Sequence, residues 1–365
     1  MIAEPSPFPH QGPLEPDQVR GREDLVADLV ARVTGRRVTA LVGPRRYGKT
    51  SLLRRVAAEV EAGGAGVVWV DLYEATSIAD LARRFDSALA SARGPVSGAL
   101  AAVAARFDLQ LGLLGVQLSR RRDERPDAEA SLDALLDALV AGSRETPTVV
   151  VIDEFPGIDR VEGAAGLLRT KLQHHVQEIG LLFAGSQPSL MRAMFAERTR
   201  PFYAQADLVE VGPFTAQAVT EIVVEGFEST DRRPGELPGL IFAFTGGHPY
   251  RTMQVADVAW RSVAAGGGPT PSTWAATLDL LRGETNLACE AVFSGLTTGE
   301  KATLRLLAHG DVLFGTQAET LGLSAGSARH AVDSLLAAGD VIDVTGRPTL
   351  VDPVLADWIR GRFPR

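Results

Sequence analysis

The amino-acid sequence predicts an α/β fold in which a parallel sheet is followed by a helical region and a small C-terminal domain. Three observations predict it. Short β-branched apolar runs, typical of buried parallel strands, alternate with amphipathic helical stretches between residues 38 and 184. From residue 215 to about 291 the pattern is helical. From residue 296 three short helices precede an alternating stretch, 341–351, and this succession is typical of a winged helix.

Length and composition describe a protein of several domains without a membrane segment. The 365 residues favour two or three domains, and 45% of them are hydrophobic. No apolar run approaches the roughly 20 residues that span a bilayer. The proline-rich start lacks the basic and apolar regions of a signal peptide. Cys289 is the single cysteine, so an intrachain disulfide is excluded. We expect a cytoplasmic protein without a membrane partner.

We divide the sequence into four parts. Residues 1–18 contain five prolines and little apolar periodicity, which predicts an extended or mobile N-terminal arm. Residues 19–212 hold the alternating strands and helices, residues 213–291 the helical region, and residues 292–365 the winged helix. Within the second part, residues 94–125 are less regular. Their alternation around two glycines in 107–118 predicts a hairpin inserted into the core.

The first predicted strand, residues 38–42, leads into a motif that binds phosphate. Residues 43–50 read GPRRYGKT and match G-x-x-x-x-G-K-[ST]; we call them the phosphate loop. Its glycines permit close backbone approaches, so that N–H groups and the positive end of the next helix converge on an anion. The strand before the motif and the amphipathic helix after it disfavour the alternative, a chance match on a glycine-bearing turn.

Each residue type of the phosphate loop suits a polyphosphate. Lys49 is expected to reach the β- and γ-phosphates, and the Thr50 hydroxyl to ligate Mg²⁺. We predict that a nucleotide contacts the whole loop and the residue after it. This set is Gly43, Pro44, Arg45, Arg46, Tyr47, Gly48, Lys49, Thr50 and Ser51.

A second motif follows about 100 residues later, where residues 147–154 read PTVVVIDE. Four β-branched apolar residues that end in two acids predict a buried strand whose carboxyl end delivers carboxylates to the phosphate site. Asp153 is expected to hold Mg²⁺, directly or through water. Glu154 is placed to orient or deprotonate the attacking water. The alternative, a strand with polar end residues, is disfavoured by the phosphate loop upstream.

Two further strand ends carry polar residues. The predicted strand 179–184 is followed by Ser186 and Gln187, and a polar side chain at this tip faces the γ-phosphate. We choose Ser186 as the catalytic candidate, and Gln187 is the alternative. Asp71 lies near the carboxyl end of the predicted strand 67–72, and for this residue we favour a capping or loop-bracing role over a chemical one.

Six segments, taken in order, resemble the STAND/AAA+ ATPases of the archaeal-type ATPase group, which also occurs in bacteria. They are Gly21-Arg22-Glu23, GPRRYGKT, VVVIDEFP, FAGSQPSLMRAMF, RPFY and TGGHPY. The resemblance covers most of residues 20–361. It implies a P-loop NTPase core, a helical lid and a C-terminal winged helix, with ATP and Mg²⁺ as cofactors. It also implies a slow ATPase that acts as a regulatory switch.

The resemblance adds three site residues. Pro249 lies in the lid turn that covers the adenine in relatives, and Arg251 is a candidate for the sensor-2 arginine, with a surface helix cation as the alternative. Many relatives also carry an arginine after the sensor-1 helix that acts on a neighbouring subunit. Here Arg198 and Arg200 precede the Pro-Phe-Tyr segment and none follows it. We choose Arg200 as the catalytic candidate, a role that implies a homo-oligomer.

Two classes of function compete for the C-terminal domain. In the favoured one, a regulatory ATPase contacts a protein partner through the winged helix. In the alternative, the chain is a DNA-associated ATPase like the origin-recognition AAA+ proteins. Residues 295–365 contain seven Lys or Arg and eight Asp or Glu, and the whole chain has net charge −8, so DNA is disfavoured. A nucleotide-binding module with negligible turnover is a third, weaker option. No guanine-reading motif exists, since Asn286 is the only asparagine.

Overall fold

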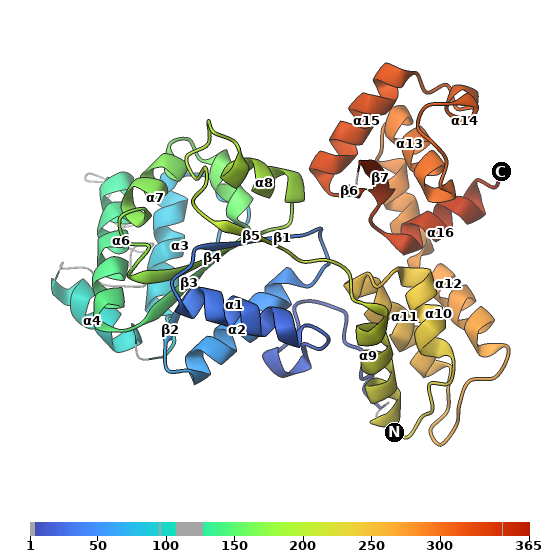
Figure 1. Ribbon diagram of the computed structural model, residues 1–365, viewed down its shortest axis with the longest axis horizontal. Helices are drawn as coiled ribbons and strands as arrows, with labels where there is room; N and C mark the ends of the chain where they lie inside the picture. The colour runs from blue at the N-terminus through green and yellow to red at the C-terminus, as the bar shows by residue number, and fades with distance from the viewer. Residues whose placement is uncertain (1–3, 95, 107–126, 345) are drawn as a thin grey trace. The chain divides into compact units, whose positions relative to one another are not determined.

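The computed structural model describes residues 4–94, 96–106, 127–344 and 346–365 (Figure 1). Contacts divide the chain into two compact units. The sheet unit comprises Glu15–Gly43 and Lys49–Val211. The helical unit comprises Met1–Leu14, Pro44–Gly48 and Gly212–Arg365. The hairpin expected at 107–118 lies outside the described residues. Among the helices that are described, none has the length and apolar character needed to cross a membrane.

The sheet unit is built on five parallel strands in the order β2-β3-β4-β1-β5. Their bounds are β1 (Thr39–Val42), β2 (Gly66–Asp71), β3 (Thr148–Asp153), β4 (Ile179–Gly185) and β5 (Asp207–Glu210). Every residue of β1, β3 and β4 is buried, which explains why apolar residues fill these strands without alternation. The carboxyl ends of β1, β4 and β3 are therefore neighbours at one edge. This sheet confirms the predicted α/β fold.

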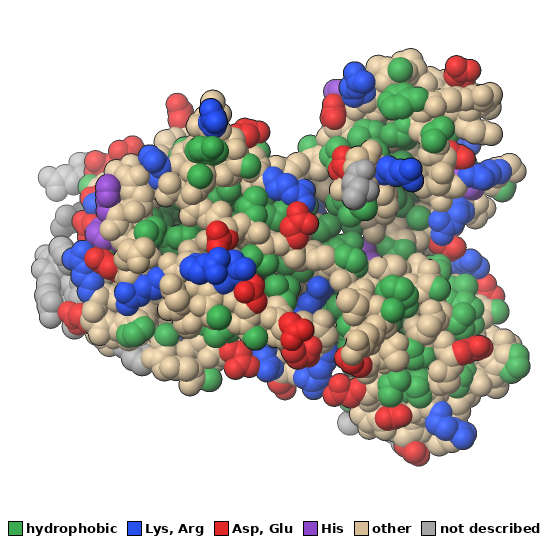
Figure 2. All heavy atoms as spheres, in the orientation of Figure 1, with side chains coloured by type: hydrophobic (Ala, Val, Ile, Leu, Met, Phe, Trp, Pro, Cys, Tyr) green, Lys and Arg blue, Asp and Glu red, His purple; other side chains and the backbone are tan. Residues whose placement is uncertain are grey.

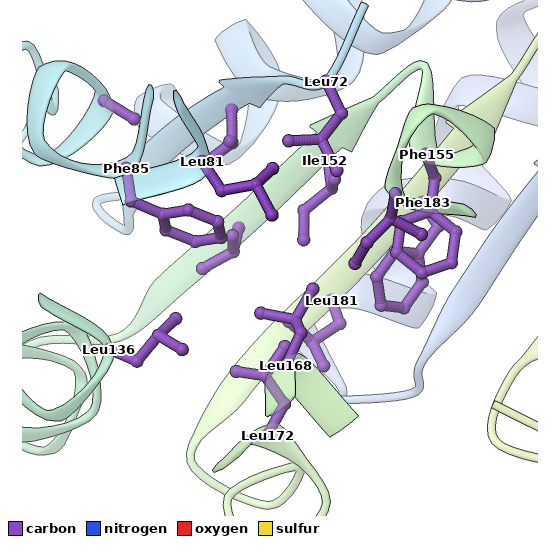
Figure 3. Packing of buried hydrophobic residues seen from close by; sticks show 14 of the residues in the cluster. Leu72, Leu81, Phe85, Leu136, Ile152, Phe155, Leu168, Leu172, Leu181 and Phe183 are labelled. Carbon is purple, nitrogen blue, oxygen red and sulfur yellow. The ribbon is translucent and has the colours of Figure 1, made fainter. Parts of the chain in front are cut away.

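Helices cover both faces of the sheet (Figure 1). One face carries α1 (Glu23–Thr34) and α2 (Lys49–Ala62), and a short 3₁₀ turn, η1 (Pro16–Gln18), packs on α2. The other face carries α3 (Ile78–Ala90), α6 (Ala128–Glu145), α7 (Ala164–Leu172) and α8 (Pro188–Ala196). Figure 3 shows part of the core on this second face, where side chains of α3, α6 and α7 are directed toward those of the strands.

Aromatic packing fixes the chain where it leaves β3. Phe155 begins the 3₁₀ turn η2 (Phe155–Arg160), and its ring lies 4.5 Å from that of Phe183 in β4, centroid to centroid. Phe195 and Phe202 complete this buried cluster. The residues directly before Phe155, which are the two acids of the second motif, are thus anchored by the core beneath them.

The elements of the sheet unit that were not predicted include a helix and a strand. The segment after Gly94 reads as irregular in the sequence, yet it forms α4 (Val96–Arg106), whose Val96 and Leu100 are fully buried. Strand β5 has only four residues, mostly exposed, because it pairs with β1 at the edge of the sheet. The apolar pattern that marks buried strands is therefore absent from β5.

The helical unit contains the helices and the hairpin that the sequence predicts. Thr215 caps the first helix as expected, because its side chain accepts the Ala218 N–H at 3.1 Å. One cluster of buried hydrophobic side chains extends through the helical unit and includes residues from Val219 to Ile359. The elements are α9 (Ala216–Glu228), α10 (Leu237–Thr245), α11 (Pro249–Arg261), α12 (Thr273–Ser294), α13 (Thr298–His309), α14 (Thr316–Thr320), α15 (Ala325–Ala338), the antiparallel strands β6 (Val341–Val344) and β7 (Arg347–Leu350), and α16 (Pro353–Arg362).

The described part of the N-terminal arm, expected to be extended or mobile, is extended and packed against the helical unit. Phe8 is fully buried in the core of the helical unit, and its ring lies 5.8 Å from that of Phe227. A Cβ at Gly226 would lie 2.4 Å from the Phe8 ring, so glycine makes the room that this ring occupies. Glu4 also pairs with Arg232 at 2.9 Å. One aromatic residue among prolines carries no periodicity, and for this reason the pattern did not reveal the contact.

Candidate functional site

The phosphate loop leaves the carboxyl end of β1 and enters α2. A Cβ at Gly43 would lie 2.8 Å from the carbonyl oxygen of Val211, so only glycine fits beside the segment that follows β5. Gly48 has φ +77°, a conformation that glycine adopts without strain. Arg46 also has a positive φ, +64°, which is uncommon for a residue with a side chain. The loop is therefore a tightly specified turn.

Lys49, the first residue of α2, folds back onto this loop. Its side chain is buried, and Nζ donates to the carbonyl oxygen of Gly43 at 2.7 Å. The ammonium thus lies where the loop closes on itself, at the positive end of a helix that begins at the same residue. This placement gives an anion held by the loop a side-chain counter-charge and a helix terminus together.

The Asp153 carboxylate lies at the end of β3, 5% exposed, among neutral donors and other carboxylates. Its oxygens accept the Thr50 hydroxyl and the Glu154 N–H, each at 3.0 Å. Burial raises the pKa of Asp153 to about 6; the two hydrogen bonds oppose this shift, and the charges of Glu154 and Asp71 add to it. None of these four neighbouring groups is a cation, so a divalent ion at this point would favour the ionised form.

Thr50 and Asp153 therefore fit the Mg²⁺ site that the sequence predicts. Hydroxyl and carboxylate oxygens are hard ligands of the kind that Mg²⁺ takes. Among the residues that the structure describes, no group of three or more His, Cys, Asp or Glu is placed to hold a metal. Mg²⁺ is usually held by one or two protein oxygens together with substrate phosphates and water.

Glu154 and Ser186, predicted as catalytic residues from separate strands, lie within hydrogen-bond distance. Ser186 Oγ donates to Glu154 Oε2 at 2.9 Å, and the Ser186 N–H points at the same oxygen from 3.4 Å. The Glu154 backbone has φ +49°, an unfavourable conformation of the kind that clusters at functional sites. Gly157 permits this turn, since a Cβ there would lie 2.0 Å from the carbonyl oxygen of Leu72. Together these contacts aim the Glu154 carboxylate at the edge of the sheet.

Two other polar residues of the sheet unit have structural contacts. Asp71 Oδ1 accepts the Tyr73 N–H at 2.8 Å, the loop-bracing role favoured from the sequence. Arg200 Nη1 donates to Asp159 at 2.8 Å, and its Nε lies 3.6 Å from Glu197. Among the interactions that the structure describes, Arg200 is not joined to the residues around Asp153. Its catalytic role stays a prediction.

The predicted lid residues lie at the start of α11. Pro249 is its first residue, and His248 caps it through Nδ1, which accepts the Arg251 N–H at 3.4 Å. Burial lowers the pKa of His248 to about 4, so the imidazole is neutral at physiological pH. Gly247, at φ +74°, lets the chain reverse here, because a Cβ would lie 2.1 Å from the carbonyl oxygen of Phe214.

Arg251 is buried, which excludes the alternative of a surface helix cation. Its Nε donates to Asp352 Oδ1 at 2.9 Å, Nη2 donates to Oδ2, and Nη1 donates to Gln254. Asp352 also caps α16 by accepting the Val354 N–H at 2.9 Å. The guanidinium holds the pKa of Asp352 below its usual range despite burial. The sensor-2 role of Arg251 stays a prediction.

Sequence reasoning missed Asp352 and His248. Asp352 precedes a proline at a helix start, which signals an N-cap, but its pairing with Arg251 spans 101 residues and leaves no local pattern. His248 lies inside the quoted TGGHPY segment, where only its neighbours were assigned roles. The glycine pair before it was the available signal, because two adjacent glycines mark a constrained turn.

A phosphate loop on a parallel sheet, with a Thr–Asp pair and a Glu–Ser pair on adjoining strand ends, defines the phosphate-loop class of nucleotide-binding proteins. The chain belongs to a family of ATPase domains predominantly from Archaea, whose sequence model matches residues 26–255. No curated protein sequence matches the chain.

Solved structures show the same fold over nearly the whole chain. The Walker-type ATPase paby2304 of Pyrococcus abyssi aligns with a TM-score of 0.70 and 18% identity, covering 97% of this chain and 99% of that one. The ORC2 protein of Aeropyrum pernix, solved in ADPNP-ADP complexes, aligns with a TM-score of 0.57 and 17% identity over 98% of both chains. At identities this low, the structural alignments show the shared fold alone, and the function has to be argued from the site.

Proposed function

We propose that this protein binds ATP together with Mg²⁺ and hydrolyses it slowly, as a regulatory switch. The observation that carries the proposal is the meeting of two pairs, Thr50–Asp153 and Glu154–Ser186, where β3 and β4 end in the sheet unit. Thr50 lies at the start of α2 and Ser186 follows β4. Each of them contacts one of the two acids that end the second motif. The family match supports ATP as the nucleotide.

In this proposal each residue has a separate task. Lys49 and the loop N–H groups offset the charge of the β- and γ-phosphates, and Thr50 and Asp153 hold Mg²⁺, which neutralises phosphate charge when bound. Glu154 accepts a proton from the attacking water or orients it, while Ser186 fixes the carboxylate through the 2.9 Å hydrogen bond. Catalysis then consists of positioning and charge stabilisation. No covalent intermediate is required.

Two substitutions separate binding from turnover. Lys49→Ala should abolish measurable ATP binding, because the phosphates lose their side-chain counter-charge. Glu154→Gln should retain binding and lose hydrolysis by roughly 10²- to 10⁴-fold, the usual contribution of a general base. Equilibrium binding of ATP and steady-state phosphate release measure the two effects. Lys171→Ala and Glu162→Gln are the matched controls, because Lys171 pairs with carboxylates of α6 and Glu162 is exposed between η2 and α7.

The outcomes are decisive for the assigned roles. Hydrolysis by Glu154→Gln at the parent rate would show that Glu154 is not the base. Binding of ATP by Lys49→Ala with parent affinity would contradict the phosphate-loop assignment itself. Binding without turnover in the parent protein would favour a nucleotide-binding module over an ATPase.

We further propose that α13, α14, α15 and the β6–β7 hairpin form a winged helix that contacts a protein partner. On the face shown in Figure 2, basic and acidic side chains are interspersed over the molecule, and the charge count of 295–365 is nearly balanced. Such a surface makes few phosphate contacts, and affinity for DNA depends mainly on them. Tight duplex binding by the full chain, with a steep dependence on salt, would contradict this assignment and favour the DNA-associated alternative.

A further inference from the structure

The tip of the phosphate loop, Pro44–Gly48, has contacts of its own within the helical unit. Arg45, Arg46 and Gly48 are exposed, whereas Tyr47 between them is only 7% exposed. A buried ring between exposed neighbours at the tip of a turn calls for an explanation. The G-x-x-x-x-G-K-[ST] motif does not specify this position, and phosphate binding requires no aromatic side chain here.

The ring of His248 is one partner of the Tyr47 ring. The two ring centroids lie 4.8 Å apart with an interplanar angle of 66°, an edge-to-face geometry that aromatic pairs prefer. His248 is itself 3% exposed and held by its capping hydrogen bond to the Arg251 N–H. Because its imidazole is neutral at physiological pH, it presents an aromatic surface to Tyr47 and no net charge.

A second contact joins the next pair of residues. The Arg46 guanidinium carbon lies 4.9 Å from the centroid of the Tyr250 ring, within the range of a cation–π interaction. Successive residues of the loop tip, Arg46 and Tyr47, are thus matched by Tyr250 and His248 at the start of α11. Arg46 is also the residue with φ +64°, so the contact is made at the point where the turn is least favourable.

The start of α11, where His248 and Tyr250 lie, is held by several contacts. Gly247 admits no side chain beside Phe214, and the Phe214 N–H donates to the Gly247 carbonyl oxygen at 2.8 Å. Behind the capping bond, Arg251 is fixed to Asp352 by two hydrogen bonds. Packing and hydrogen bonds therefore brace the first turn of α11, which contacts the loop tip.

We propose that Tyr47, packed on His248, is a positioning residue that holds the phosphate loop in its anion-binding conformation. The inference rests on the proposed ATP binding and concerns its affinity. An anion is held by backbone N–H groups whose directions depend on the conformation of the loop. A loop that is ordered before binding loses less conformational entropy when the nucleotide arrives, so the contact strengthens binding without touching the reacting atoms.

A double-mutant cycle tests the proposal in the full-length protein. Tyr47→Ala removes the ring, and His248→Asn removes the imidazole while keeping a side-chain oxygen that caps α11. Each substitution should weaken ADP and ATP binding by roughly 3- to 10-fold, the size expected for an aromatic pair. The double variant should be no weaker than either single one, because the two changes remove the same contact. The loss should fall mainly on affinity rather than on the turnover number at saturating ATP, because Glu154 and Ser186 are unchanged.

Two measurements keep the outcomes distinct. Phe314→Ala, which removes an exposed ring elsewhere in the helical unit, should leave the affinity unchanged. Thermal unfolding without nucleotide shows whether the variants are folded. A Tyr47→Ala affinity within twofold of the parent, or full additivity of the two substitutions, overturns the positioning role. Failure of the parent protein to bind nucleotide would instead overturn the proposed function.

Discussion

Two aspartates, one in each unit, respond to burial in opposite ways. Asp153 at the end of β3 and Asp352 at the start of α16 both lose hydration, and burial alone raises the pKa of each. Asp352 meets the Arg251 guanidinium at 2.9 Å, and its pKa falls below the ordinary value. Asp153 meets a hydroxyl, an N–H and two further carboxylates, and its pKa rises to about 6. The two pKa values shift in opposite directions because the Arg251 guanidinium pairs with Asp352, whereas the groups that shift the pKa of Asp153 include no cation.

The opposite shifts indicate different roles, a structural one for Asp352 and a ligand-binding one for Asp153. A buried charge is stable when it is paired within the protein, as Asp352 is. Holding Asp153 ionised without such a partner costs free energy, and a bound cation recovers it. The contrast thus assigns Asp352 to the cohesion of the helical unit and supports Asp153 as a ligand of Mg²⁺. Substituting each aspartate by asparagine tests the contrast directly.

Asp352→Asn should have the largest effect on stability, lowering the free energy of unfolding by about 3 kcal/mol, since it leaves the Arg251 charge buried and unpaired. Asparagine is a good N-cap, so the start of α16 retains its cap and the loss reports the ion pair. Urea unfolding measures it. Glu284→Gln, which breaks a solvent-exposed pair with Arg261, should cost less than about 1 kcal/mol. Equal losses in the two variants would contradict the buried-pair assignment.

Asp153→Asn should have an effect of opposite sign, a gain in the free energy of unfolding at pH 7, because a buried unpaired charge disappears. The same substitution should weaken Mg²⁺-dependent ATP binding at least tenfold, since a charged ligand is lost. Unfolding with and without Mg²⁺-ATP separates the two effects. A large loss of stability without any ligand would show that the Asp153 charge is needed for folding.

The pH dependence follows from the raised pKa of Asp153. An acid with a higher pKa in the folded state binds more protons there than in the unfolded chain, so its contribution to stability falls as pH rises. The window runs from the ordinary pKa of an aspartate, 3.8, to about 6, and the loss amounts to roughly 3 kcal/mol. The parent protein should lose this stability between pH 4 and pH 6 relative to Asp153→Asn. Parallel curves for the two proteins would contradict the shift.

The residues of the candidate site could be predicted because the local sequence pattern and the topology of the sheet both point to them. Glu154 and Ser186 follow runs of buried apolar residues, and because parallel strands share an edge, their proximity followed from the strand assignment. Contacts between distant segments were not predictable in the same way. Phe8 packs against Phe227, and Arg251 against Asp352, through folding of the whole unit. No spacing in the chain encodes either pair.

Short or exposed elements were missed for a related reason. β5 borders solvent, so its residues need not be apolar, and the periodicity that identifies strands is lost. Tyr47 lies inside a recognised motif, yet its burial depends on His248, 201 positions further along. Sequence patterns report which face of an element is buried, and they do not name the partner. The roles of Pro249, Arg251 and Arg200 in ATP turnover therefore remain predictions.

Arg200 provides the smallest expected effect on stability. Its pairs with Asp159 and Glu197 are partly exposed to solvent, so Arg200→Ala should change the free energy of unfolding by about 1 kcal/mol or less. Its effect on turnover should be far larger if a neighbouring protomer supplies this guanidinium to the γ-phosphoryl group, since such arginines contribute about 10³- to 10⁵-fold. Arg192→Ala, which breaks another exposed pair in the same unit, is the control.

The assignment in trans makes a further prediction about mixtures. Turnover should rise more than linearly with protein concentration, because an active site would need two protomers. Mixing Glu154→Gln with Arg200→Ala should restore part of the activity, since one protomer contributes an intact Arg200 and the other an intact Glu154. Activity proportional to concentration, with no rescue on mixing, would show that the site is complete within one chain. Arg251 would then be the next candidate, and it would have to exchange its buried contact with Asp352 for the phosphate.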